Sequence, residues 1–521
     1  MPSAEDSDRG DRRLRWRGIT RLQFAALCVV LVLIGVAIRF APGLDDCAPG
    51  VEHYGPECVG VTDGGFAFSP VLGLDAVIER IQEENDWVEQ QDREQDRSSV
   101  SIAYALPLPT QLNDESDRWL HELQGAHLAQ RRANRTTALG DQPLIRLLVA
   151  NAGDDNRYWE PVVAQLRDRV DSPDRLVAVI SLGKSLAATQ EAIRELTSHD
   201  IPVIAAQLTA DDLTGEAAQG SVDGLARVAP TNSDEAQAAV AYLRLDPLVR
   251  RALLVQDTRD DDVYASTLGE AFAREFAGGL IGRVAEYDSS LPGVANAFAR
   301  MMPNICALRP DVVYFAGRGD ALSDFIEALP ERTCVDFPIN VVTGDAGVDV
   351  ATLLRRQLDE GRKGMQAGLE ANATFRYTAL AHPSAWSAAP ASFSGASLEY
   401  FQQDCLDCFT SLFPGETLDD SAAIMGHDAV VTAVRAIRSA AGNRDLNENP
   451  VLPGEVIQQL NQLHDALAVP GASGWISLDE NGDPVNKAIP ILQLRPDGTV
   501  QFVTLSSPLG TPFIPPQPDT P

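Results

Sequence analysis

From residue 99 onward, short runs of apolar, often β-branched residues alternate with longer segments whose apolar residues recur at helical spacing. The short runs predict buried strands, because a parallel strand covered on both faces is hydrophobic throughout, and the longer segments predict helices. The expected strands form a first set and then a second set: 101–108, 144–150, 176–182 and 201–206, followed by 251–256, 282–287, 311–316 and 339–343. Two successive sets of alternating strands and helices predict two parallel sheets, and therefore two α/β lobes.

The N-terminal region contains one uncharged apolar run, residues 22–38 (LQFAALCVVLVLIGVAI). Its length is at the short end for a transmembrane helix. Six arginines precede it, and acidic residues follow Arg39, so the positive-inside rule places residues 1–21 in the cytoplasm and the rest of the chain outside. A cleaved signal peptide is the alternative. We favour a retained anchor, because no small-x-small cleavage site follows the run, where the chain reads RFAPG.

The remaining chain divides by composition. Residues 39–97 are expected to form an extracytoplasmic stalk, in which 45–69 is rich in glycine, proline and acid and 75–97 is a surface helix. The main domain follows at 99–505, and a proline-rich tail occupies 506–521.

Composition and charge exclude several function classes. A chain of 521 residues exceeds one compact core, and 45% hydrophobic with 22% charged residues is typical of a globular protein. The net charge of −32 repels phosphate backbones, so no nucleic acid is expected to bind the main body. The sequence holds no Walker loop, G-x-S-x-G elbow, dinucleotide fingerprint or H-E-x-x-H motif. We therefore expect no enzyme, cofactor or metal site, and a hydrolase is the weakest alternative.

Six cysteines follow the apolar run, an even number that favours disulfides in an oxidising compartment over reduced, buried thiols. We expect Cys47 to pair with Cys58, and Cys306 with Cys334, which flank the strand 311–316 and its helix. Cys405-x-x-Cys408 pairs locally or with other cysteines. A redox or zinc half-site is the less favoured interpretation, since a second metal-binding pair is missing.

The order of these segments carries a family resemblance. SIAYALPLP, LQGAHLAQRRAN, IRLLVANAGDD, RALLVQDTRDDDVYASTLGEAF, RPDVVYFAG and VVTGDAGVD follow one another as in the type I periplasmic-binding-protein family. Within it, the chain most resembles the branched-chain amino-acid (Leu/Ile/Val) substrate-binding proteins of ABC transporters, over residues 99–505. The resemblance implies an α/β fold of two parallel-sheet sandwich lobes with several crossovers. Lobe 1 is expected at 99–231 and 365–470, and lobe 2 at 232–345 and 474–505.

The resemblance also implies a ligand site between the lobes. Its residues lie in loops at the carboxyl ends of strands or in the segments that follow, where α/β sheets bind ligands: Ser185, Gln207, Thr209, Tyr264 and Asp345. The resemblance implies that Ser185 and Thr209 hold a ligand carboxylate, and that Tyr264 and Asp345 cover the ligand and pair with its ammonium. Simpler roles stay open: Ser185 as a helix N-cap, Tyr264 as an interlobe packing residue, and Asp345 as a turn residue.

Four other features bear on the ligand. Gln207 and Leu208 stand where the family has two small residues, and Lys184 is an unexpected cation that favours a more acidic ligand. Arg318 is a minor site candidate, with a surface salt bridge as its default role. The segment 382–413 is expanded relative to the family.

The function implied is that of a membrane-anchored extracytoplasmic solute-binding protein. Its partners would be a small polar ligand such as an amino acid, an ABC permease, and the membrane through the N-terminal helix. The alternative is a non-transporting ligand sensor or envelope scaffold protein that uses the same fold.

Overall fold

The computed structural model describes residues 47–95, 97–111, 115–213, 223–403 and 405–516. Every element discussed below belongs to one compact unit, residues 49–521. The cytoplasmic tail and transmembrane helix expected at 1–38 lie outside the described residues. Among the described helices, none combines the length and apolar character needed to cross a bilayer.

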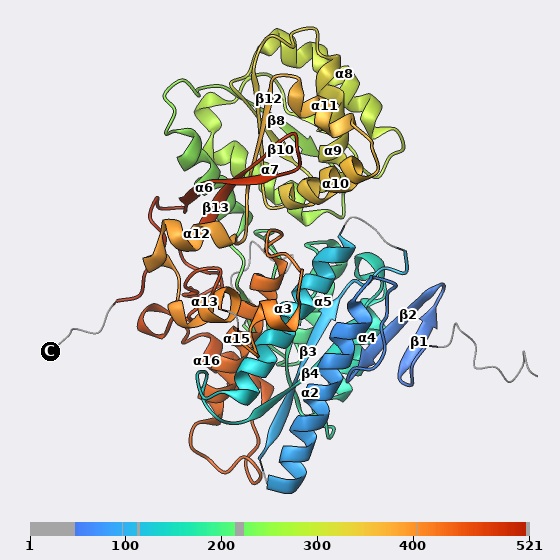
Figure 1. Ribbon diagram of the computed structural model, residues 1–521, viewed down its shortest axis with the longest axis vertical. Coiled ribbons are helices and arrows are strands. Elements are labelled where there is room, and N and C mark those ends of the chain that lie inside the picture. Colours follow the sequence, from blue (N-terminus) through green and yellow to red (C-terminus); the bar gives the residue numbers. More distant parts are fainter. Residues whose placement is uncertain (1–46, 96, 112–114, 214–222, 404, 517–521) are drawn as a thin grey trace, which may run out of the picture. The chain divides into compact units, whose positions relative to one another are not determined.

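The first lobe is built on a seven-stranded sheet with the order β1-β2-β4-β3-β5-β6-β7. Its five later strands are parallel: β3 (Ser99–Leu106), β4 (Leu144–Asn151), β5 (Leu176–Ser181), β6 (Val203–Ala205) and β7 (Leu225–Arg227). The helices of this lobe come from two separate stretches of the chain, and α13 and α14 pack against other helices rather than against the sheet: α2 (Leu74–Gln95), α3 (Ser116–Arg135), α4 (Trp159–Asp168), α5 (Ala187–Thr197), α13 (Gly395–Gln402), α14 (Phe409–Leu412), α15 (Ala422–Ala441) and α16 (Pro453–Leu460). Figure 1 shows this lobe in its lower half.

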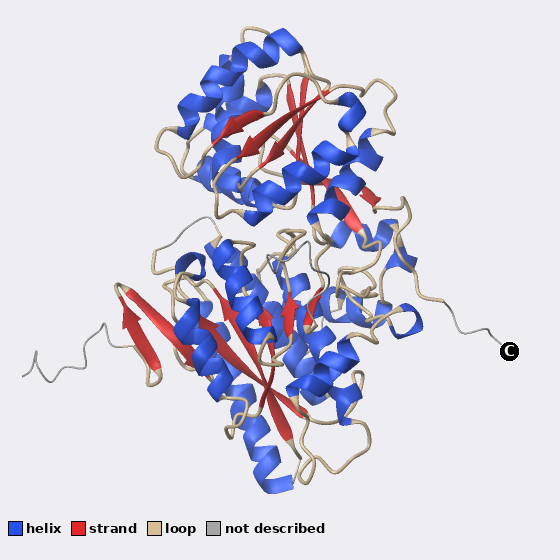
Figure 2. Ribbon diagram, turned by 180° about the vertical axis from the view of Figure 1, so that it is seen from behind, coloured by secondary structure: helices blue, strands red, loops and turns tan. Residues whose placement is uncertain are grey.

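The second lobe is built on another seven-stranded sheet, with the order β14-β13-β12-β11-β10-β8-β9. Five strands are parallel: β8 (Ala252–Asp257), β9 (Ala285–Tyr287), β10 (Val312–Ala316), β11 (Ile339–Thr343) and β12 (Ala373–Thr378); β13 (Ile489–Leu494) and β14 (Val500–Ser506) are antiparallel. The accompanying helices are α6 (Asn232–Leu243), α7 (Val263–Glu275), α8 (Val294–Leu308), α9 (Gly319–Ala328), α10 (Gly347–Asp359) and α11 (Gly364–Glu370). Helices cover the sheets of both lobes, as Figure 2 shows, and the expected two-lobed α/β fold is confirmed.

The strands of lobe 2 are hydrophobic throughout because each face of the sheet has its own core. On β10, Val313 and Phe315 enter one buried cluster, while Val312 and Tyr314 enter another. Side chains alternate between the two faces of a strand, so a strand buried on both faces must be apolar at every position. This is the pattern that made the strand detectable in the sequence.

Two predicted boundaries are wrong. The segment interpreted as a stalk instead contributes β1 (Val51–Tyr54), β2 (Glu57–Thr62) and α2 to lobe 1, since β2 pairs with β4. The segment 365–378, assigned to lobe 1, belongs to lobe 2, because β12 lies between β11 and β13 in the second sheet. The chain thus crosses between the lobes after β7, after β12, and between α16 and β13. Near this last crossing α12 (Pro383–Ala388) packs against β14.

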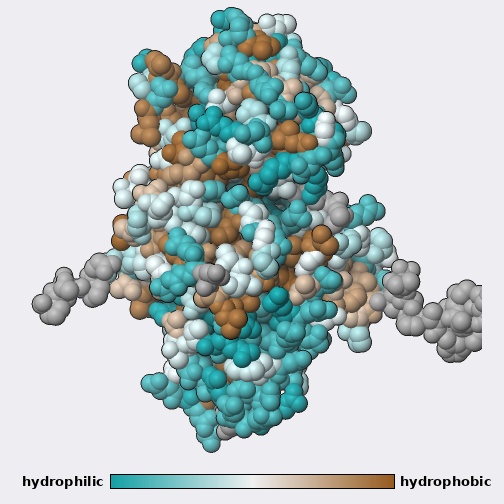
Figure 3. Space-filling model, in the orientation of Figure 1, coloured by the Kyte–Doolittle hydropathy of each residue, from teal (hydrophilic) through white to brown (hydrophobic). Residues whose placement is uncertain are grey.

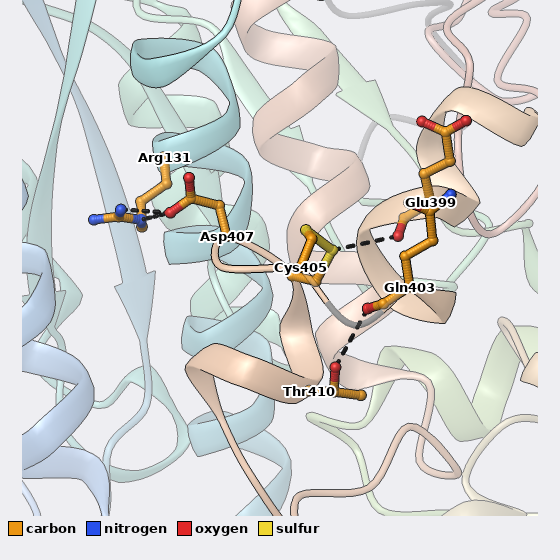
Figure 4. Close-up of a disulfide and its surroundings, with 7 residues drawn as sticks. Arg131, Glu399, Gln403, Cys405, Asp407 and Thr410 are labelled. Carbon is orange, nitrogen blue, oxygen red and sulfur yellow. Dashed lines mark hydrogen bonds and ion pairs between the residues drawn. A yellow bond between two sulfur atoms is a disulfide. The ribbon is translucent and has the colours of Figure 1, made fainter.

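Disulfides hold two of the loops. Cys306 of α8 pairs with Cys334, as expected, with a Cα–Cα distance of 5.6 Å. Cys405 pairs with Cys408 across a short loop whose Asp407 accepts hydrogen bonds from Arg131 of α3, at 2.5 Å to Nη2 (Figure 4). Cys47 and Cys58 are each disulfide-bonded, and their pairing with one another remains a prediction.

Candidate ligand-binding site

All five sequence-predicted site residues meet between the two lobes. Ser185, Gln207 and Thr209 come from loops after β5 and β6 of lobe 1, and Tyr264 and Asp345 come from α7 and from the loop after β11 in lobe 2. They line one small cavity of about 20 Å³, room for roughly one water molecule. Each is at least nine-tenths buried. The structure therefore brings the predicted positions together in a nearly filled space.

Ser185 has a different role from the N-cap considered for it. Helix α5 has Leu186 as its N-cap residue and no side-chain cap. The Ser185 hydroxyl accepts a hydrogen bond from the backbone N–H of Ala210, at 3.3 Å, and its carbonyl accepts one from the N–H of Tyr264, also at 3.3 Å. Ser185 therefore joins two loops of lobe 1 and contacts lobe 2 directly.

Tyr264 and Asp345 meet lobe 1 from the other side. The hydroxyl of Tyr264 accepts a hydrogen bond from the N–H of Ala346 at 3.2 Å, and burial, followed by the nearby charge of Asp345, raises its pKa well above the usual value. Thr209 donates its hydroxyl to Oδ1 of Asp345 at 3.4 Å, which links the lobes through side chains. Asp345 thus does more than form a turn, although its carbonyl also accepts the N–H of Val348.

Arg118 occupies the centre of this site, and sequence reasoning missed it. Its Nε donates to Oε1 of Gln207 at 2.8 Å, and its other nitrogens lie 3.4 Å from Asp345 and 3.6 Å from Asp349. One signal was available: Arg118 lies in the first turn of α3, where the helix dipole disfavours a cation. An arginine at such a position indicates a compensating acidic partner elsewhere in the fold.

The charges of this cluster depend on each other. Burial raises the pKa of Asp349 to about 7, and the guanidinium of Arg118 opposes that increase. Burial alone would lower the pKa of Arg118, but the carboxylates of Asp349 and Asp345 outweigh it and raise the pKa. The family resemblance assigns Asp345 to a ligand ammonium. In this structure the cation beside Asp345 is Arg118 of the chain itself.

The two other cations that line the small cavity already have anionic partners. Lys184 lies 2.5 Å from Glu115 and 2.8 Å from Asp155, both in lobe 1. Arg318 donates through Nε and Nη2 to the carboxylate of Asp262, at 2.7 and 2.9 Å, and lies over the ring of Tyr264. Since Lys184 is balanced by two carboxylates, its presence alone does not favour an acidic ligand.

A second buried acid fixes the position of Gln207. Glu122 of α3 accepts hydrogen bonds from Tyr104 at 2.8 Å, from Ser181 and from the side-chain amide of Gln207. Burial raises the pKa of Glu122, and these three donors oppose the rise. The side-chain nitrogen of Gln207 therefore donates to Glu122, and its side-chain oxygen accepts a hydrogen bond from Arg118.

Two larger cavities share residues with this small one. A cavity of about 420 Å³ shares Lys184, Arg318 and Asp349 with it, and another of about 600 Å³ shares Arg118 and Asp349. Both contain residues of each lobe. The space between the lobes is therefore open in two larger cavities and nearly closed around Arg118.

Comparisons with known proteins identify the fold. No family model and no curated protein matches the chain. Among solved structures, the chain is similar to the leucine-binding protein LivK of Thermotoga maritima (TM-score 0.55, 18% identity, 78% of this chain and 99% of that one). It is also similar to the branched-chain amino-acid substrate-binding protein LivJ of Streptococcus pneumoniae, solved with isoleucine (TM-score 0.53, 15% identity, 79% and 100%). A solute-binding protein of Rhodopseudomonas palustris, solved with 3,4-dihydroxybenzoic acid, aligns as well (TM-score 0.52, 14% identity, 80% and 96%).

Proposed function

We propose that this chain, which has the type I periplasmic-binding-protein fold, is an extracytoplasmic solute-binding protein that holds a small polar molecule between its lobes. The observation that supports this most is the convergence of buried polar side chains from both lobes on one site at the carboxyl ends of the strands. Because groups of both lobes face this site, a bound solute gains its full set of contacts only when the lobes are closed.

An amino acid is the ligand that best fits the arrangement. Ser185 and Thr209 would receive its carboxylate from lobe 1, and Asp345 would pair with its ammonium from lobe 2, beneath Tyr264. Similar folds have been solved with isoleucine and with an aromatic acid, so the fold accommodates carboxylates of different kinds. Delivery to an ABC permease would then be the purpose of binding.

Binding at this site requires Arg118 to move. Arg118 and a ligand ammonium would compete for the same carboxylate, since Arg118 lies 3.4 Å from Asp345. Ligand entry would then be an exchange. The solute would replace Arg118 at the contacts that Arg118 makes in the absence of ligand.

A thermal-shift screen of the full chain against amino acids and small polar carboxylates tests the proposal. A true ligand at a hundred times its dissociation constant adds about 2.7 kcal/mol to the free energy of unfolding. The substitution Asp345→Asn should abolish the shift, while Asp168→Asn, at an exposed position of α4, should leave it unchanged. A panel without any hit contradicts the proposal.

We also propose that residues 22–38 anchor the chain in the cell membrane, with its main domain on the outer side. The support is the arginine-rich flank before the apolar run and the acidic residues after it. The full chain should sediment with membranes, and protease added outside intact cells or spheroplasts should degrade it. Release of a soluble mature form that lacks the run would indicate a cleaved signal instead.

A sensor or scaffold that uses the same fold without transporting a solute is the second candidate. The narrow central cavity of about 20 Å³ and the guanidinium inside it favour this alternative. A ligand screen without hits, on a chain that is folded and bound to membranes, would support the sensor or scaffold alternative.

A further inference from the structure

The cavity of about 420 Å³ between the lobes has an unusual charge distribution. Its volume lies within the usual range for small-molecule sites. Seven carboxylates and three cations line it: Glu115, Asp154, Asp155, Asp257, Asp320, Asp324 and Asp349, with Lys184, Arg259 and Arg318. We call it the acidic cavity.

The three cations do not balance these acids, because each is already paired. Arg318 is engaged by Asp262. Arg259 donates to both oxygens of Asp261, at 2.5 and 2.9 Å, and lies 3.6 Å from Asp155 of the wall. Asp261 and Asp262 lie outside the cavity lining. Lys184 is shared between Glu115 and Asp155. The positive charges therefore leave a surplus of negative charge on the cavity wall.

Asp257, at the end of β8, carries the clearest part of that surplus. The residue is only 2% exposed. Its Oδ1 accepts hydrogen bonds from the backbone N–H groups of Arg259 and Ser289, at 3.1 and 3.0 Å. Its Oδ2 is buried and meets no hydrogen-bond donor among the described residues. A buried carboxylate oxygen without a donor is costly, so this position favours a donor supplied from outside the chain.

A second acid of the wall, Asp324 of α9, is also uncompensated. No cation of the described part of the chain forms an ion pair with it. Burial raises its pKa, and so do the neighbouring charges of Glu327 and Asp320. Asp257 and Asp324 thus place negative charge on the lobe 2 side of the acidic cavity.

We propose that the acidic cavity is a subsite for the cationic end of a small organic solute, an ammonium or guanidinium group received by Asp257. The inference rests on the proposed solute-binding function and specifies its ligand class. A metal ion fits less well, because among the described residues no three of these carboxylates bring oxygens within 4.8 Å of one another. The net charge of −32 also attracts cationic solutes toward the cleft.

The acidic cavity continues from the central site. Both are lined by Lys184, Arg318 and Asp349. A basic amino acid would therefore place its carboxylate at Ser185 and its α-ammonium at Asp345, and extend its side chain toward Asp257. The family resemblance to binders of apolar amino acids does not suggest this preference, which arises from the charges of this chain.

Titration calorimetry of the full chain with lysine and norleucine measures the subsite. Norleucine has the carbon skeleton of lysine without the terminal ammonium. We expect lysine to bind about tenfold more tightly, and Asp257→Asn to weaken lysine binding about tenfold while norleucine binding stays the same. Asp324→Asn should act in the same direction, which provides a second test if Asp257→Asn does not fold. Asp168→Asn is the exposed control and should change neither ligand.

The outcomes separate this inference from the proposed function. Equal affinity for lysine and norleucine, or an equal loss of affinity for both in Asp257→Asn, overturns the cationic subsite. Binding of either amino acid would still uphold the solute-binding proposal. Failure of both amino acids and of the wider panel contradicts both proposals. If MgCl₂ or CaCl₂ stabilised the chain and Asp257→Asn abolished this effect, the cavity would be assigned to a metal ion and the inference would be overturned.

Discussion

At the scale of single residues, Arg118 is the cation that joins the two lobes at the small central cavity. Its side chain is 12% exposed and lies between two carboxylates that are 8% and 10% exposed. Burying one acid beside another is unfavourable unless a cation lies between them. Arg118 of lobe 1 therefore compensates two neighbouring carboxylates of lobe 2.

The substitution Arg118→Gln should lower the free energy of unfolding at neutral pH by about 3–5 kcal/mol, because it leaves Asp345 and Asp349 without their cation. The matched control is Arg167→Gln, whose ion pair with Glu195 is about 40% exposed on each side and should cost less than about 1 kcal/mol. Chemical denaturation measures both. The deficit should shrink as the pH falls below about 7, since Asp349 then takes up a proton. Equal stability of the two variants would refute the role given to Arg118.

Sequence reasoning located the site residues better than it described their surroundings. The family resemblance pointed to the five positions, and a parallel α/β sheet brings the loops at its strand ends together. Sequence reasoning did not point to Arg118 or Glu122, whose contacts depend on how helix α3 packs against the strand-end loops; the place of Arg118 in the first turn of α3 was the one signal for it. The ligand roles of the five residues remain predictions.

At the scale of elements, helix α3 owes its position to a close crossing with α15. A Cβ added to Gly125 would lie 1.9 Å from the carbonyl oxygen of Ala423, and one added to Gly426 would lie 2.2 Å from that of Glu122. The two glycines thus let the helix backbones approach each other. This contact fixes the helix that carries Arg118 and Glu122.

Gly125→Ala should therefore destabilise the chain by about 3 kcal/mol, since the methyl group meets backbone that cannot move alone. Gly454→Ala in α16 is the control, because no atom lies within 4 Å of its added Cβ. We expect thermal or urea unfolding to separate the two variants clearly. A neutral Gly125→Ala would mean that the crossing adjusts freely.

His121 of α3 ties the same helix to the loop before α15. Burial alone would lower the pKa of His121, but the Asp420 carboxylate, with Glu416 at 3.1 Å, raises it to about 9. The folded-state pKa exceeds the unfolded one, so the stabilisation is fully present below about pH 6.5 and is lost as the pH rises to about 9. Its size is on the order of 3 kcal/mol.

The difference in unfolding free energy between the wild type and His121→Gln, followed from pH 6 to 10, isolates this term. It should be largest at the acidic end and disappear near pH 9–10. Taking the difference cancels Lys487, whose pKa burial lowers to about 8. A difference that stays constant with pH would exclude the proposed His121 ionisation.

Several of the elements missed by the sequence have mixed polarity. Strands β1 (VEHY) and β12 (ATFRYT) carry polar residues and lack the continuous apolar run that identified β10 or β11. Strand β2 is mostly buried, but glycine and proline beside it favoured a stalk. Short strands of this kind take their conformation from neighbouring strands rather than from their own residues.

At the scale of the whole molecule, buried and partly buried polar contacts hold the two lobes together. Arg118 with Asp345, Arg259 with Asp155, and Arg356 with Asp117 span the lobes at 3.4–3.7 Å. The crossing that leads back to β13 is fixed separately, since Asp428 of α15 accepts the N–H groups of Ala472 and Ser473. Ion pairs therefore join the lobes together with backbone hydrogen bonds such as that from Ala187 to Asp261, while the crossing has hydrogen bonds of its own.

The surface of lobe 1 is strongly hydrophilic at one end. Hydrophilic residues cover most of the end of lobe 1 where α2 ends, as Figure 3 shows. The acidic excess of the chain is thus compatible both with solubility and with attraction of cations to the cleft.

Amide hydrogen exchange of the full chain, with and without the best ligand of the screen, tests whether a solute binds between the lobes. Ligand should slow exchange at residues 183–187 of lobe 1 and 344–349 of lobe 2 together, and Asp345→Asn should remove both effects. Protection in one lobe alone would contradict binding between the lobes. So would protection confined to the separate cavity of about 390 Å³ lined by Asn461, His464 and Phe513.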